Sequence, residues 1–224
     1  MPHTTRFTLT NRHGQRIVGL IDEPEGDAPI PRALVLCHGY GGDKDGRYLQ
    51  RIAAALTAAG AATIRFDFTN GAGESDGTLA GASVSGYADD LDDVLDFVAQ
   101  QPRLAAAATA IGGHSYAGRV VLTVAGRRAG LAAVYFLCGV YERPGENQMS
   151  AVVARIAAPI VIITAAADRE VPLAHAEALA RAAGDKIAAF ETIPGADHNF
   201  LAPGTADHLA RIIQETFFQL TTSL

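Results

Sequence analysis

The sequence predicts one α/β domain, spanning residues 1–224, in which helices cover both faces of a mainly parallel sheet. Apolar strand-like runs and amphipathic helical runs alternate through most of the chain, as they do where helices connect parallel strands. Residues 33–37 and 160–164 are uninterrupted apolar runs, so both faces of these strands are expected to be buried. Hydrophobic residues make up 49% of the chain, enough to fill such a core.

The chain opens with a different pattern. Two strands, Arg6–Thr10 and Arg16–Asp22, flank a polar turn at residues 11–14 and predict an antiparallel hairpin over about residues 6–22. A loop rich in proline, glycine and acidic residues follows, from Pro24 to Pro31. The other predicted strands, which bring the total to about eight, are Ala33–Cys37, Ala62–Phe68, Thr109–Gly112, Leu131–Leu137, Ile160–Thr164 and Lys186–Ile193. The predicted helices are Tyr48–Ala59, Tyr87–Gln100, Tyr116–Arg127, Met149–Ile156, Leu173–Ala183 and Thr205–Leu220.

Charge and composition argue against several classes of partner. A net charge of −6, without a cluster of lysine and arginine, argues against a nucleic-acid surface. No apolar run reaches the length of a membrane span, and the first residues lack the apolar core of a secretory signal. We therefore expect a cytoplasmic protein with no membrane partner; its oligomeric state is not predicted. Cys37 and Cys138 lie in apolar strand-like runs, which indicates buried free thiols in a reducing compartment rather than a disulfide.

A serine at one predicted strand-to-helix turn is the most informative residue. The small residues Gly113 and Ala117 stand two positions before and after Ser115, where a strand turns directly into a helix. A nucleophile elbow has this pattern, because small flanking residues avoid a collision at the sharp bend that exposes the hydroxyl. The usual form is Gly-x-Ser-x-Gly, from which Ala117 departs by one methyl group. The alternative for such a serine in isolation is a helix N-cap.

Two more loops at predicted strand ends carry the partners that a serine nucleophile needs. Asp168 follows the strand at 160–164, and His198 follows the strand that ends at Ile193. The carboxyl ends of parallel strands lie at one edge of a sheet, so these side chains are expected near Ser115. A neutral imidazole can take the proton of the serine hydroxyl, and a carboxylate can orient that imidazole. The sequence therefore predicts a catalytic set of Ser115, Asp168 and His198.

A glycine-rich turn at residues 38–42, after the strand 33–37, supplies a fourth element. Acyl transfer develops an oxyanion that needs backbone N–H donors, and this turn and the elbow can present those of Tyr40 and Tyr116. No histidine, cysteine and acid cluster has metal-ligand spacing, and no phosphate-binding loop is present, so neither metal nor cofactor is expected. The further candidate pocket residues are His38, Gly39, His114 and Tyr141.

Together these motifs resemble the α/β-hydrolase superfamily over essentially the whole chain. Serine, acid and histidine occur in that superfamily's order. The runs 38–42, 65–75 and 195–200 are similar to those of cinnamoyl and feruloyl esterases, related small esterases and acyl-peptidase-like hydrolases. The resemblance implies an α/β-hydrolase fold with a catalytic triad of Ser115, Asp168 and His198 and with Tyr40 and Tyr116 as oxyanion donors.

The chain departs from this pattern in two places. Those esterases usually carry a lid after the sixth strand of the fold, whereas here residues 139–158 alone separate two predicted strands. That length suits a short helix rather than a lid domain, so we expect a minimal cap or none and an open, shallow cleft. The loop after Asp67 is also one residue longer than is usual in the family.

The expected function is hydrolysis of a small-molecule carboxylic ester through an acyl-enzyme. Two alternatives remain at this stage. One is an amide hydrolase of the acyl-peptide or aminopeptidase type, for which Glu142, Arg143 and Glu146 are the nearby candidates to hold a peptide terminus. The other is a non-catalytic member of the fold that binds a ligand.

Several polar residues also have structural interpretations. In isolation, Asp168 would be an acid at a helix N-terminus. Asp197 is expected to cap its own loop, and His38 to support the glycine-rich turn. The acidic run 89–96 is interleaved with apolar residues at helical spacing, so its aspartates are expected to face solvent.

Overall fold

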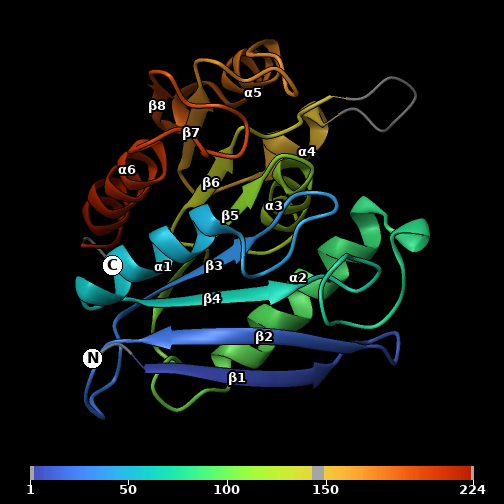
Figure 1. Ribbon diagram of the computed structural model, residues 1–224, viewed down its shortest axis with the longest axis vertical. Helices are drawn as coiled ribbons and strands as arrows, with labels where there is room; N and C mark the ends of the chain where they lie inside the picture. Colours follow the sequence, from blue (N-terminus) through green and yellow to red (C-terminus); the bar gives the residue numbers. More distant parts are fainter. Residues whose placement is uncertain (1–2, 143–148, 223–224) are drawn as a thin grey trace.

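A computed structural model describes residues 3–142 and 149–222 of the chain. These residues form one central sheet. Its eight strands are β1 (His3–Thr10), β2 (Arg16–Glu23), β3 (Arg32–Cys37), β4 (Ala62–Asp67), β5 (Ala108–His114), β6 (Val134–Leu137), β7 (Ile160–Ala165) and β8 (Ile187–Ile193). Their order across the sheet is β1-β2-β4-β3-β5-β6-β7-β8, with the N-terminal hairpin at one edge and β8 at the other (Figure 1). β1, β2 and β4 pair antiparallel, and all pairs from β4 to β8 are parallel. The predicted fold class and hairpin are confirmed.

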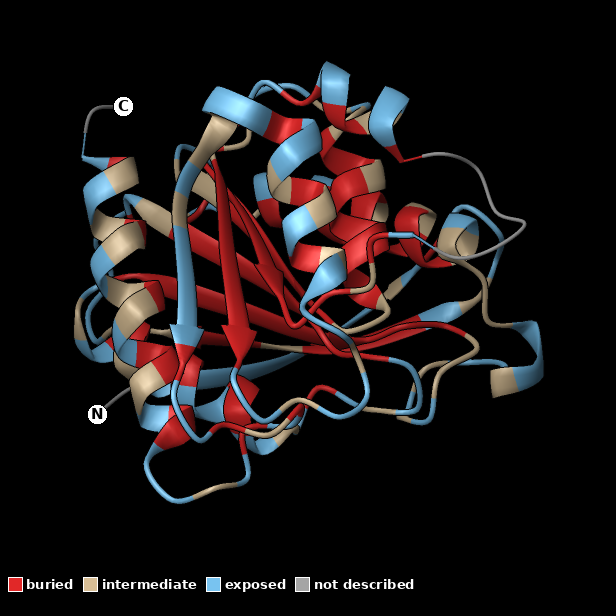
Figure 2. Ribbon diagram, turned by 90° about the horizontal axis from the view of Figure 1, so that it is seen from above, coloured by how far each residue is buried: buried red, intermediate tan, exposed pale blue. Residues whose placement is uncertain are grey.

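Within the described residues, six α-helices cover the two faces of this sheet. They are α1 (Arg47–Ala58), α2 (Val84–Ala99), α3 (Ala117–Ala125), α4 (Ser150–Arg155), α5 (Ala174–Ala183) and α6 (Thr205–Thr221), and two short 3₁₀ turns lie at Leu79–Gly81 and Gly184–Lys186. Helices α1 and α6 lie on one face and α2 to α5 on the other (Figure 1). Leu34 and Leu36 of β3 point to the first face, whereas Val35 and Cys37 point to the second. The central strands are thus buried on both sides, as their apolar runs predict (Figure 2).

Several predicted boundaries differ from the structure by one to three residues, and two of these differences have clear local reasons. β6 begins at Val134 rather than Leu131, because ladder pairing with β5 and β7 starts only there. Helix α2 begins at Val84 rather than Tyr87, because the Ser83 hydroxyl accepts the Gly86 N–H at 3.1 Å and caps an additional turn.

The spacing of the acidic run in α2 predicts that its aspartates face solvent, which is wrong for Asp92 (8% exposed) and above all for Asp90. Its side chain is fully buried and accepts hydrogen bonds from Asn11 Nδ2 (2.7 Å), the Thr69 N–H (2.8 Å) and the Thr69 hydroxyl (2.7 Å). Burial raises the pKa of Asp90. Asp90 therefore ties helix α2 to the hairpin turn and to the loop after β4.

Both cysteines, Cys37 and Cys138, are free and buried, as predicted. Burial raises the pKa of both thiols well above its ordinary value. Among the described residues, no helix has the length and apolar composition that crossing a membrane requires.

Candidate active site

Ser115 has a backbone conformation that non-glycine residues seldom adopt, with φ of 55°. It joins the end of β5 to the start of α3. Hydrogen bonds from its neighbours hold this bend. The Ser115 N–H donates to the Leu137 carbonyl at 3.0 Å, and the Ser115 carbonyl accepts the N–H groups of Gly118 and Val140, each at 2.9 Å. A strained serine between a strand and a helix is the geometry of a nucleophile elbow.

The two small residues that flank Ser115 differ in how much room there is for a side chain. A Cβ atom on Gly113 would lie 2.3 Å from the Ala117 carbonyl oxygen, so glycine is required there. Ala117 itself is buried in the core, with its methyl group packed on the side of α2 to α5. The departure from Gly-x-Ser-x-Gly thus falls where the fold accommodates a methyl group.

The three residues of the predicted catalytic set lie together at one edge of the sheet. His198 Nε2 lies 2.9 Å from Ser115 Oγ, and His198 Nδ1 lies 2.8 Å from Asp168 Oδ2. His198 is buried, at 5% exposure, so bulk water does not compete strongly for its two ring contacts. A hydroxyl, an imidazole and a carboxylate in this series can move a proton from oxygen to nitrogen and stabilise the resulting imidazolium.

The two interpretations of Asp168 both describe real contacts, one for each carboxylate oxygen. Oδ2 faces His198, whereas Oδ1 accepts the N–H groups of Glu170 (2.8 Å) and Val171 (2.9 Å) in the turn before α5. Burial alone would raise the pKa of Asp168, but the hydrogen bonds from His198, Val171 and Glu170 hold it below its ordinary value. Asp168 is therefore ionised at neutral pH and fixed in orientation.

The glycine-rich turn places one peptide group beside the serine. The Gly39 carbonyl accepts hydrogen bonds from His38 Nδ1 (2.8 Å) and from the Gly42 N–H (3.1 Å). In a planar trans peptide the following N–H points the opposite way, so the Tyr40 N–H is directed away from His38. A Cβ atom on Gly39 would lie 3.0 Å from Ser115 Cβ, which shows how closely this peptide approaches the serine.

His38 holds that turn from behind and does not line the groove. It is buried; its Nε2 accepts the Phe68 N–H at 3.2 Å, so the ring proton is on Nδ1, facing Gly39. Burial lowers the pKa of His38, which keeps the ring neutral. The hydrogen bonds agree with its interpretation as support for the turn.

The loop after β4 is fastened to the same turn by a buried ion pair. Lys44 Nζ lies 3.1 Å from Asp67 Oδ2, and the Lys44 N–H donates to Oδ1 at 2.7 Å. The Glu74 N–H also donates to Asp67, at 2.8 Å. A Cβ atom on Gly73 would lie 2.1 Å from the Asp67 carboxyl carbon, so the longer loop passes close against this carboxylate.

His114, the residue before the serine, supports the histidine loop. Its Nε2 donates to the His198 carbonyl oxygen at 2.8 Å, and the two imidazole rings lie 4.7 Å apart. Burial, followed by the proximity of His198, lowers the pKa of His114 to about 3. The His114 ring is therefore neutral at neutral pH, with its proton on Nε2.

An open groove of about 450 Å³ leads to Ser115 and His198. Gly39 and His114, two of the predicted pocket residues, line it, whereas His38 and Tyr141 do not. Tyr40 (59% exposed) and Leu201 (58% exposed) are apolar groups on its wall. Its charged lining residues are Asp43, Arg47 and Glu170.

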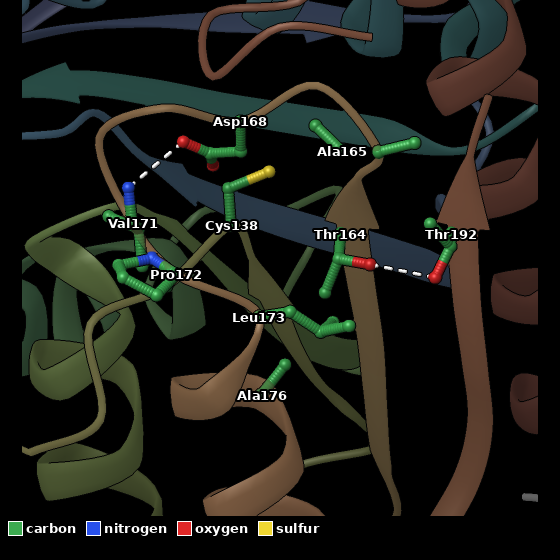
Figure 3. Close-up of a pocket in the computed structure, with 11 residues that line it drawn as sticks. Cys138, Thr164, Ala165, Asp168, Val171, Pro172, Leu173, Ala176 and Thr192 are labelled. Atoms are coloured by element: carbon green, nitrogen blue, oxygen red, sulfur yellow. Dashed lines mark hydrogen bonds between the residues drawn. The ribbon is translucent and has the colours of Figure 1, made fainter. Parts of the chain in front are cut away.

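A smaller pocket lies on the other side of the Asp168 loop (Figure 3). Cys138 and Asp168 line one end, and Leu173 and Ala176 line the other. The hydroxyl groups of Thr164 and Thr192 are 2.9 Å apart on its wall. Ser115 does not line this pocket, so the groove is the candidate substrate site.

The segment 139–158 contains the short helix α4. Tyr141 is buried, and its carbonyl accepts Arg119 Nη1 at 2.8 Å. Of the candidates to hold a peptide terminus, Glu142 is exposed, and Arg143 and Glu146 lie outside the described residues.

Sequence reasoning missed Glu170. Its Oε2 lies 3.8 Å from His198 Nε2, and its side chain is 62% exposed in the groove. The available signal was its place two residues after Asp168, in a loop at the end of a strand. The side chain of Tyr48 was also missed; it is buried, it lines the groove, and its ring centroid lies 4.7 Å from that of His114.

Within the described ranges, one group of side chains has metal-ligand chemistry at short range: Cys138, Asp168 and His198, whose candidate ligand atoms lie within 4.8 Å of one another. Two of these three are already hydrogen-bonded to each other through Asp168 Oδ2 and His198 Nδ1. A metal bound by all three would have to replace that contact.

Solved structures with this architecture include several hydrolases. Est1E from Butyrivibrio proteoclasticus, with ferulic acid bound, superposes with a TM-score of 0.85 at 17% identity, covering 96% of this chain and 99% of that one. Dienelactone hydrolase from Anabaena variabilis gives 0.76 at 20% identity, covering 97% of both chains. The esterase domain of a Rhodothermus marinus protein gives 0.76 at 22% identity, covering 96% of this chain and 97% of that one. These likenesses show a shared fold.

Comparison by sequence gives a match to a family model. No curated protein matches the chain. Residues 31–219 match the model of a family described as alpha/beta hydrolase domain. This range runs from the loop before β3 into α6, so it includes the elbow, the acid loop and the histidine loop.

Proposed function

The chain belongs to the family of alpha/beta hydrolase domains, and on that premise we propose that it hydrolyses carboxylic esters of small molecules through an acyl-enzyme. One observation carries the proposal: the continuous series from Ser115 Oγ through His198 to Asp168, at 2.9 and 2.8 Å, beginning at a strained elbow. A serine that only capped a helix would not require a buried imidazole between its hydroxyl and a carboxylate.

In the first half of the reaction, Ser115 Oγ attacks the ester carbonyl carbon while His198 Nε2 takes the hydroxyl proton. The carbonyl oxygen becomes an oxyanion, for which the N–H groups of Tyr40 and Tyr116 are the proposed donors. The imidazolium, stabilised by Asp168, then gives its proton to the leaving alcohol as the carbon–oxygen bond breaks. The acyl group remains on Ser115.

In the second half, water replaces the alcohol. His198 Nε2 accepts a proton from water as the water oxygen attacks the acyl carbon. The second oxyanion collapses, the bond to Ser115 Oγ breaks, and Oγ recovers its proton from the imidazolium. The products are a carboxylic acid and a regenerated serine, so the cycle consumes only ester and water.

Two observations support a small ester as the substrate. The groove at Ser115 has a volume of about 450 Å³, which lies in the range of small-molecule sites. Two of the similar solved structures are esterases or esterase domains, and Est1E holds ferulic acid. We carry the ester class, but no particular acid, from those proteins to this chain.

The test is labelling with a fluorophosphonate probe, followed by turnover of p-nitrophenyl esters of graded acyl length. Ser115→Ala should abolish labelling and lower kcat by about 10⁴- to 10⁶-fold. Ser85→Ala, an exposed serine in the first turn of α2, is the control and should behave as wild type. Undiminished ester turnover by Ser115→Ala would disprove the mechanism. Amide analogues with the same acyl group test the amide-hydrolase alternative, and tight binding without turnover would favour a ligand-binding role.

A further inference from the structure

Glu170 is a charged side chain beside His198 to which the proposed reaction gives no role. The Glu170 backbone N–H donates to Asp168 Oδ1 at 2.8 Å. The carboxylate that orients His198 therefore also holds the backbone of Glu170 in position. Its side chain reaches into the groove, with Oε2 3.8 Å from His198 Nε2 and Oε1 3.4 Å from Asn199 Nδ2. The position of this carboxylate is therefore tied to the proposed catalytic geometry.

The contact with Nε2 determines which part of a substrate would meet Glu170. In the proposed reaction, His198 Nε2 gives its proton to the oxygen of the leaving alcohol. A group within 4 Å of that nitrogen lies next to the alcohol portion of the ester. Glu170 therefore faces the leaving group, whereas the oxyanion turn at Gly39 and Tyr40 faces the carbonyl oxygen.

The charge of Glu170 is available to a ligand. Within the described part of the chain, no lysine or arginine forms an ion pair with it; its contacts are His198 and the weak hydrogen bond from Asn199. The other charged groups of the groove, Asp43 and Arg47, belong to the segment that leads from the glycine-rich turn into α1. At the leaving-group position the groove thus presents a negative charge.

We propose that Glu170 forms a subsite for a cation on the alcohol portion, so that esters whose leaving group carries an ammonium are preferred over those whose leaving group carries a carboxylate. This inference rests on the proposed esterase function and specifies its substrate class. Attraction to an ammonium and repulsion of a carboxylate act in the same direction on the ratio of their kcat/KM values.

The test compares three thioesters of one acyl group, the one best accepted among the p-nitrophenyl esters. Their leaving thiols are thiocholine, 2-mercaptoethanol and 3-mercaptopropionate, which are cationic, neutral and anionic, and thiol release is followed with one colorimetric reagent. Each kcat/KM value is divided by that of the neutral thioester, so a general loss of activity cancels. In wild type the cationic thioester should have the highest value and the anionic one the lowest.

Glu170→Gln should lower the cationic-to-anionic ratio by about two- to thirtyfold, as expected when one solvent-exposed charge acts in opposite directions on the two leaving groups. High salt should reduce the wild-type ratio more than that of the variant, because it screens this charge. The matched control is Glu215→Gln, which removes the same charge from an exposed position on α6 outside the groove and should keep the wild-type ratio.

A ratio that changes less than twofold in Glu170→Gln, while the ester is still turned over, would overturn the subsite and leave the esterase function intact. A fall of equal size in Glu215→Gln would also overturn it, because a diffuse field would then explain the preference. Absence of turnover and of fluorophosphonate labelling in folded wild-type protein would instead disprove the esterase function, and the subsite with it.

Discussion

Substitution of His38 tests how the Gly39–Tyr40 peptide, whose N–H is a proposed oxyanion donor, is held. The ring makes two separable contacts: Nδ1–H donates to the Gly39 carbonyl at 2.8 Å, and Nε2 accepts the Phe68 N–H at 3.2 Å. The amide of asparagine reaches the position of Nδ1, and that of glutamine reaches the position of Nε2. His38→Asn should therefore keep the contact with Gly39 and lose that with Phe68, and His38→Gln should do the reverse.

The two variants should then fail in different ways. His38→Asn leaves the buried Phe68 N–H without an acceptor, which costs about 1–3 kcal/mol of stability, but kcat should stay within about threefold of wild type. His38→Gln loses one hydrogen bond, worth about 0.5–1.5 kcal/mol, because Gly42 still donates to the Gly39 carbonyl at 3.1 Å. Its Gly39–Tyr40 peptide is then held by one hydrogen bond instead of two, and complete loss of one oxyanion donor costs about 10²- to 10³-fold in kcat. With Gly42 retained, we expect about tenfold.

The assays are kcat and KM on the best p-nitrophenyl ester and the midpoint of urea unfolding, compared at an unchanged m-value. The loss in His38→Gln should appear in kcat rather than KM, since the oxyanion forms only as the reaction proceeds. Wild-type kcat in His38→Gln would refute the reasoning. A larger loss of kcat in His38→Asn than in His38→Gln would refute it as well.

Three further predictions concern stability and the elbow. The pKa of His114 is about 3 in the folded protein, whereas a histidine in an unfolded chain has a pKa of about 6.5. As the pH drops from 7 to 5, the unfolded chain takes up this proton and the folded protein does not. The free energy of unfolding should therefore fall by about 2 kcal/mol through this residue. Urea unfolding at both pH values measures the fall, and His114→Gln should lose that part of it. Gly113→Ala should destabilise the protein by about 3 kcal/mol, because the added Cβ would collide with the Ala117 carbonyl. Ala117→Gly should cost about 1 kcal/mol of stability and keep fluorophosphonate labelling. Equal shifts in the thermal unfolding midpoint of the two variants would contradict this. Asp67→Asn should cost about 1–3 kcal/mol in urea unfolding, because the amide replaces only one of the two oxygens that accept hydrogen bonds, whereas Lys44 keeps its ion pairs with Asp45 and Glu74. A loss below about 0.5 kcal/mol would mean that the buried pair is not needed.

The sequence by itself determined the fold class and the loops that carry the candidate site. Alternating apolar strands and amphipathic helices define a parallel sheet, because each pattern depends on spacing within a short segment. Parallel strands place their carboxyl ends at one edge of the sheet, so the sequence alone predicts that Ser115, Asp168 and His198 lie close together. The sequence likewise predicts the small residue at position 113, because this requirement arises from the local bend at Ser115.

Contacts between distant segments were decided only by the tertiary structure. Asp90 looks like a solvent-facing helix residue, yet Asn11 and Thr69 meet it from the hairpin and from the β4 loop. The donation of His114 to the His198 carbonyl and the reach of Glu170 to His198 Nε2 depend on how three loops pack at the sheet edge. Such contacts have no signature within a short window of sequence, because their partners are set by side-chain direction and by the packing of elements far apart in the chain.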